Sequence, residues 1–179
     1  MRTSETPADD LTRTLKTYEL IIISGGQTGV DRGALDAALD TGTACGGWCP
    51  EKRLAEDGTI EPRYPLQELA GAGYTARTRM NVVDSDGTLV ITFGTATGGT
   101  ARTLEFCRKL GKPSLIIDAA LTPVGDAARE AAAFIREQRI RRLNVAGPRA
   151  SREERGYAYA FGTVTRLISE YAQTRGYIT

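Results

Sequence analysis

The sequence contains no histidine, only four lysines and only three cysteines. Without histidine the chain cannot build a Ser-His-Asp or Cys-His catalytic site, an imidazole metal site or a histidine pH switch. The cysteines, Cys45, Cys49 and Cys107, are too few for a disulfide scaffold and lack the further soft ligands of a zinc site. We therefore expect packed thiols and a reducing, cytoplasmic location.

Excess charge and long apolar runs are absent too. Lys and Arg total 23 against 22 Asp and Glu, so no diffuse positive field favours nonspecific nucleic-acid binding. No run approaches the roughly twenty apolar residues of a membrane span. Residues 1–16 lack an apolar core, so we expect a disordered tail rather than a signal peptide or anchor. Residues 17–179 suffice for one buried core, which predicts a single domain.

The clearest structural pattern is a strand followed by a glycine turn and a helix. Residues 18–24 (YELIIIS) form a β-branched run typical of a strand buried on both faces, and a helix is predicted from Val30 until Gly42 ends it. Apolar strands at 88–93, 114–118 and 143–146 each precede helical periodicity. This repetition predicts an α/β fold with a doubly wound, mostly parallel sheet and helices on both faces.

Helix boundaries are also predicted. A helix within 100–110 should end at Gly111, and the next should begin at Thr122 and Pro123. The last helix should open with a capping box, Ser151 to Glu154, and its apolar stripe is expected to be core or subunit interface. Residues 49–65 show neither period and contain three prolines. An ordered binding loop is favoured there over disorder, because large rings at its ends can anchor it.

Three glycine-rich turns, at 25–33, 94–103 and 144–151, are predicted to meet at the carboxyl edge of the sheet. Glycine lets the backbone approach a phosphate, and the amides and dipole at the following helix favour anions. Each turn also carries hydroxyl groups and an arginine, respectively Arg32, Arg102 and Arg149. One such turn is explained equally well by steric needs, but three together predict a site for a phosphate-bearing small molecule. None is a Walker loop or a G-x-G-x-x-G fingerprint, so ATP hydrolysis and NAD chemistry are not expected.

Several candidates have two interpretations. Asp31 either complements the dipole of its helix or accepts hydrogen bonds from a ligand. Ser85 and Asp86 have the ordinary chemistry of a turn, with ligand contact as the alternative. Arg77 and Arg79 are secondary candidates for anion contact. The complete candidate binding set is Gly25, Gly26, Gln27, Thr28, Gly29, Asp31, Arg32, Arg77, Arg79, Ser85, Asp86, Gly98, Gly99, Thr100, Arg102, Thr103, Gly147, Arg149 and Ser151.

Several motifs in order resemble the molybdenum cofactor carrier proteins, over roughly residues 18–171. The motifs are SGGQTGVDRGALDAAL, GGWCP, RYPL, RTRMNVVDSDGTLVI, GGTARTLEF and LNVAGPRAS. The resemblance implies a Rossmann-like fold and a homo-oligomer, expected to be a tetramer. It also implies binding, protection and delivery of molybdenum cofactor without chemical turnover, with molybdoenzymes or cofactor-synthesis proteins as partners. That cofactor is a phosphate-bearing pterin whose own sulfurs hold the metal, so no protein metal ligands are expected.

Two other classes remain as alternatives. The sequence is similar to the cytokinin-activating phosphoribohydrolases at Gly99 and Thr100, but Thr103 stands where that group has a carboxylate. Glu105 is displaced by two residues, about 200° around the helix, and cannot simply replace it.

Residues 24–31 also resemble the DNA-processing protein A family. Single-strand binding is the less favoured alternative, because the aromatic residues do not interleave with basic runs.

Overall fold

The computed structural model describes residues 20–175 and begins with strand β1 (Ile21–Ile23), a run of three isoleucines. β-Branched side chains suit a pleated strand, and Ile22 and Ile23 are buried. Helix α2 (Val30–Asp40) follows, and Gly42 adopts a φ of +67° just beyond its end. The predicted order of strand, glycine turn and helix is confirmed. Residues 1–16, expected to be a disordered tail, lie outside the described part of the chain.

Six strands form one parallel sheet in the order β5-β2-β1-β8-β6-β7. Ile22 of β1 pairs with Cys45 on one side and Leu143 on the other. The remaining strands are β2 (Cys45–Pro50), β5 (Leu66–Leu69), β6 (Gly87–Thr92), β7 (Ser114–Asp118) and β8 (Arg142–Ala146). The three apolar strands predicted after residue 87 are thus confirmed within one residue at their ends.

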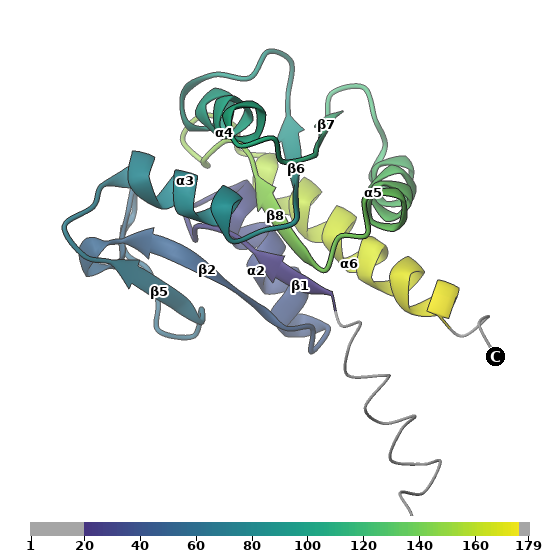
Figure 1. Ribbon diagram of the computed structural model, residues 1–179, viewed down its shortest axis with the longest axis horizontal. Helices are drawn as coiled ribbons and strands as arrows, with labels where there is room; N and C mark the ends of the chain where they lie inside the picture. The colour runs from purple at the N-terminus through teal and green to yellow at the C-terminus, as the bar shows by residue number, and fades with distance from the viewer. Residues whose placement is uncertain (1–19, 176–179) are drawn as a thin grey trace, which may run out of the picture.

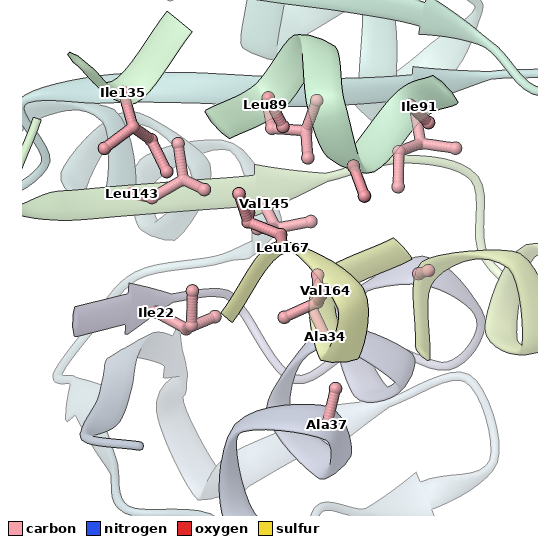
Figure 2. Packing of buried hydrophobic residues seen from close by; sticks show 14 of the residues in the cluster. Ile22, Ala34, Ala37, Leu89, Ile91, Ile135, Leu143, Val145, Val164 and Leu167 are labelled. Carbon is pink, nitrogen blue, oxygen red and sulfur yellow. The ribbon is translucent and has the colours of Figure 1, made fainter. Parts of the chain in front are cut away.

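Helices cover both faces of the sheet (Figure 1). Helix α6 (Gly156–Arg175) packs against both α2 and α5 (Val124–Gln138), whereas α3 (Tyr74–Val83) packs with α4 (Gly98–Lys109). The main core lies between the sheet and the helices α2, α5 and α6. Figure 2 shows strand residues Ile22, Leu89 and Val145 near Val164 and Leu167 of α6. The α/β, Rossmann-like fold predicted from the sequence is confirmed.

The strand order reveals a rearranged connectivity. The last strand, β8, is inserted between β1 and β6 rather than added at an edge. The six strands can be renumbered 1 to 6 in the order β6, β7, β8, β1, β2, β5, as if the chain began at β6. Read from β7 to β5, the sheet then has the order 2-1-3-4-5-6, which begins with the flavodoxin-type doubly wound order. The order therefore reverses at β6, and a doubly wound sheet places its crevice beside the strand where this happens.

The segment between β2 and β5 is ordered, as predicted. It contains a short 3-10 turn (Glu51–Arg53) and a hairpin of β3 (Leu54–Ala55) and β4 (Gly58–Thr59). The Arg53 guanidinium donates to four backbone carbonyls around the hairpin, including those of Ile60 and Leu66. Ile60 and Tyr64 are buried against Leu35 of α2, so the segment has a small core of its own.

Two features differ from the sequence predictions. Helix α6 begins at Gly156, so the predicted capping box at Ser151 is wrong; Ser151 instead binds Glu56. Helix α5 begins one residue later than expected, with Pro123 as its N-cap. Within residues 20–175, no helix combines the length and apolar character needed to cross a membrane.

Candidate anion-binding cavity

A cavity of about 680 Å³ opens at the carboxyl ends of β1, β8 and β6. All three predicted glycine turns contribute to its lining, and α3 supplies further residues. The three turns therefore meet in one place rather than lying on separate sides of the molecule. The predicted residues that line the cavity are Gly25, Gln27, Asp31, Arg77, Gly98, Gly99, Thr100, Arg102, Thr103, Gly147 and Arg149.

The most buried charges in the cavity wall are an ion pair between α2 and α3. Arg77 Nη1 lies 3.2 Å from Asp31 Oδ2, and both side chains are mostly buried, at 12% and 7% exposed. Burial raises the pKa of Asp31 more than Arg77 and the neighbouring backbone amides lower it. The Nε of Arg77 is buried and has no hydrogen-bond partner among the described residues, so this guanidinium retains an unused donor.

Gly25 makes this ion pair possible. A Cβ atom on Gly25 would lie 1.5 Å from Arg77 Nη1 and 2.5 Å from its Cζ. The guanidinium thus passes directly over the backbone of the first turn to reach Asp31. The glycine that the sequence indicated as an anion-binding residue has, in the structure, the role of admitting an arginine.

The start of α4 forms another part of the wall. The amides of Thr100 and Ala101 donate to the Thr97 carbonyl, whereas those of Gly98 and Gly99 precede the first hydrogen bond of the helix, and Thr97 provides no side-chain cap. The positive end of the helix dipole therefore faces the cavity. Arg102 donates from Nη1 to the hydroxyl of Thr75 and so joins α4 to α3 at the rim.

The lining carries more positive than negative charge. Four arginines line the cavity, Arg77, Arg102, Arg149 and Arg152, against the carboxylates of Asp31 and Glu153. Asp31 is paired with Arg77, and Arg155 holds Glu153 with two 2.7 Å hydrogen bonds. Because Arg77 pairs with Asp31 and Arg149 pairs with Glu56 outside the lining, the charges of Arg102 and Arg152 are the ones of these four that remain available for an anion.

Other predicted residues lie outside the lining. Arg32 binds Asp57 and the carbonyl of Gly26, while Thr28 and Ser151 both bind Glu56. The residues that sequence reasoning placed in the site but that do not line the cavity are Gly26, Thr28, Gly29, Arg32, Arg79, Ser85, Asp86 and Ser151. Arg152 and Glu153 were missed as cavity residues, because they were interpreted as part of a capping box.

Ser85 and Asp86 precede β6 and therefore lie at the amino edge of the sheet, opposite the cavity. The Ser85 hydroxyl donates to the carbonyl of Val82, and Asp86 accepts from the amides of Arg141 and Arg142 at 2.9 and 2.8 Å. These contacts are those of a turn, the first of the two interpretations that the sequence allowed.

Replacing Asp86 with Ala should therefore affect stability and not ligand binding. We expect a loss of about 1 kcal/mol in the free energy of unfolding, because two backbone amides lose a charged acceptor at an exposed position. Urea denaturation measures that loss. A titration with the cavity ligand compares the affinity of the variant with that of the unchanged protein, and the two affinities should be equal. Weakened binding with unchanged stability would instead place Asp86 in the site.

Metal binding by protein side chains finds no support in the described residues. Between residues 20 and 175, no group of three or more His, Cys, Asp or Glu side chains could hold a metal ion. The polar groups of the cavity are donors for the most part, namely guanidinium groups, backbone amides and hydroxyls. Such a set binds the oxygen atoms of anions rather than cations.

Comparison with known proteins agrees with this architecture. The model of the circularly permutated YpsA SLOG family matches residues 22–168. A crystal structure of a proposed molybdenum carrier protein from Syntrophus aciditrophicus SB shares 41% sequence identity and has a TM-score of 0.81. The similarity covers 84% of this chain and 95% of that one. No curated protein matches the sequence. From its matched residues and its permuted strand order, the chain belongs to the circularly permutated YpsA SLOG family.

Proposed function

We propose that this chain binds, protects and delivers molybdenum cofactor in the cavity at the carboxyl ends of β1, β8 and β6. The observation that carries the proposal is the convergence of three glycine turns and four arginines on that cavity. Its volume of about 680 Å³ suits one small molecule. The solved structure of a proposed molybdenum carrier protein, at 41% identity, supports a molybdenum-related ligand.

The cavity chemistry suits a ligand with two anionic ends. Molybdenum cofactor presents a terminal phosphate and an oxo-molybdenum group on either side of a polar pterin. The start of α4 with Arg102 offers one group of donors, and Arg77 with its unused Nε offers another. The cofactor's own sulfurs hold the metal, so the chain needs no metal ligands of its own.

A carrier function is favoured over hydrolysis by the residues of α4. Thr103 stands where a phosphoribohydrolase has its carboxylate, and its hydroxyl donates to the carbonyl of Gly99. Glu105 is exposed, pairs with Lys109 at 2.6 Å and does not line the cavity. Neither residue therefore offers a general acid or base to a bound nucleotide. A homotetramer, a cytoplasmic location and transfer to molybdoenzymes or cofactor-synthesis proteins remain predictions.

The direct test is thermal unfolding of the purified chain with four separate ligands. A ligand that binds only the folded state raises the midpoint by mass action. We expect released molybdenum cofactor to raise the midpoint more than AMP, molybdate or a single-stranded oligonucleotide. A larger shift with AMP together with adenine release would favour the hydrolase, and a larger shift with the oligonucleotide would favour nucleic-acid binding.

Arg102→Ala should weaken cofactor binding about tenfold, the effect of losing one exposed charge-assisted contact. The matched control is Arg108→Ala, which removes the same side chain from the last turn of α4, away from the cavity. Fluorescence titration with released cofactor gives both dissociation constants. Equal affinities in the two variants would remove Arg102 from the proposed site.

A further inference from the structure

Glu56 forms an unusual contact beside the cavity. It lies with Asp57 in the two-residue turn of the β3–β4 hairpin, and its carboxylate extends to residues of the first and third glycine turns. Oε1 accepts from the hydroxyl of Thr28 and from the amide of Ser151 at 3.0 Å. Oε2 accepts from the hydroxyl of Ser151 and lies 3.2 Å from Arg149 Nε.

The two turns that carry these donors are held together by contacts that do not involve Glu56. The Ala150 amide donates to Thr28 Oγ1 at 3.1 Å. The hydroxyl hydrogen of Thr28 is therefore free to donate to an acceptor beyond the two turns, which in this structure is Glu56. Val30 donates its amide to the Pro148 carbonyl, which holds the first and third turns together. An amide, two hydroxyls and a guanidinium therefore converge on one point, a combination that binds the oxygens of an anion.

The carboxylate is firmly held but comes from the β3–β4 hairpin, outside the glycine turns. Burial raises the pKa of Glu56, yet the hydrogen bonds from Ser151 and Thr28 and the charge of Arg149 outweigh it and leave the pKa below its ordinary value. The hairpin that carries Glu56 is organised around Arg53 and packs in a small core shared with Leu35 of α2. At its tip, Glu56 and Asp57 make the side-chain contacts to the glycine turns.

We infer that the donors around Glu56 form a subsite for a tetrahedral oxyanion, and that the Glu56 carboxylate occupies it as a built-in competitor. Opening of the hairpin tip would remove the carboxylate and admit the oxyanion group of a ligand. Arg149 belongs to both places, because it lines the cavity and pairs with Glu56. Displacement of Glu56 would therefore also free one more positive charge for the cavity.

The hairpin tip that carries Glu56 sets how strongly its carboxylate competes with a free oxyanion. A group held on a short loop has an effective concentration in about the millimolar range, so a free oxyanion below that concentration competes poorly. Removing the carboxylate should lower the apparent dissociation constant of an oxyanion by about tenfold or more, because the competent state is no longer a minor population. The identity of the natural ligand at this subsite rests on the proposed function.

The experiment is calorimetric titration of the full chain with sodium molybdate, and in parallel with AMP as a phosphomonoester, at constant ionic strength. We expect Glu56→Ala to bind at least one of them about tenfold more tightly than the unchanged chain. Asp57→Ala is the matched control, because it loosens the same hairpin tip while leaving the carboxylate on its donors. The combination of Glu56→Ala with Ser151→Ala should lose the gain. Glu56→Gln, which keeps the side-chain volume, replaces the alanine variant if that one does not fold.

Equal affinity of the Glu56 variants and the unchanged chain for both probes would overturn the inference and leave Glu56 as a structural tether. An equal gain in Asp57→Ala would overturn it as well, since loop opening alone would then explain the effect. Failure of the carrier proposal gives a different result. The chain would then not bind released cofactor, while Glu56→Ala still gained affinity for the inorganic oxyanion.

Discussion

Replacing Arg77 with Met should lower the free energy of unfolding by about 3–5 kcal/mol at neutral pH, the cost of leaving a buried carboxylate without its partner. Asp31 is 7% exposed, and its ion pair with Arg77 spans α2 and α3. Methionine approximates the length of the arginine stem, so packing is largely kept while the charge is lost. Urea denaturation of the single variants and of the combination with Asp31→Asn forms a double-mutant cycle. The combined variant should recover most of the loss, because it leaves no uncompensated charge.

The pH dependence of this effect has a definite sign. The pKa of Asp31 is already raised by burial in the unchanged protein, and loss of Arg77 removes the main influence that lowers it. The folded variant then binds a proton more tightly than the unfolded chain, so its stability falls as pH rises through the raised pKa and recovers on acidification. The difference from the unchanged protein should therefore be largest near pH 7 and smaller near pH 5. A difference that is constant with pH would contradict an origin in the Asp31 charge.

Gly29→Ala should lower stability by about 2–4 kcal/mol and abolish binding in the cavity. Gly29 has φ +78° and ψ −129°, a conformation costly to any residue with a side chain, and a Cβ would lie 2.5 Å from the Pro148 carbonyl oxygen. The Ala150 amide nitrogen would lie 2.8 Å from the same Cβ. Because both neighbouring atoms belong to the backbone, relief requires the first and third glycine turns to separate, at an overpacking cost of about 1–3 kcal/mol. These two turns supply the donors of the proposed oxyanion subsite and part of the cavity lining.

The matched control is Gly42→Ala, which separates backbone strain from collision. Gly42 also has positive φ, +67°, but a Cβ at this position would have no neighbouring atom within 4 Å. It should therefore lose only about 1 kcal/mol, the cost of a left-handed residue with a side chain. Urea denaturation of both variants, with cofactor titration of each, makes the comparison. Equal losses would show that contact between the two turns is not what makes Gly29 necessary.

The elements that the sequence predicted are those where local pattern and tertiary packing agree. Ile22 and Ile23 of β1 and the centres of the apolar strands β6 and β8 are buried, and the edge strand β7 buries Ile117. Each glycine turn marks the end of a strand. By contrast, β2 reads CGGWCP, with two glycines and a proline, and no local propensity favours a strand there. It forms because β1 and β5 offer hydrogen bonds on both sides. Such long-range pairing is not visible in a local pattern.

The candidate site shows the same division. The convergence of the three turns followed from the parallel sheet, since the carboxyl ends of its strands share one edge. The partners of individual side chains did not follow. Arg32 was expected to bind an anion, but Asp57 of the hairpin neutralises it, and Ser151 binds Glu56 instead of capping a helix. Both acidic residues lie in an irregular segment whose position depends on the burial of Ile60 and Tyr64. No sequence spacing relates that segment to the turns.

The place of β8 in the sheet also affects how the chain is made. The strands preceding it form two groups, β5-β2-β1 and β6-β7, which touch in the sheet only through β8. During synthesis, β1 and β6 each expose an unpaired edge until residues 142–146 have left the ribosome. The six-stranded sheet is therefore complete only after this late-made strand is available, and a chain that ended before it would leave β1 and β6 with open edges.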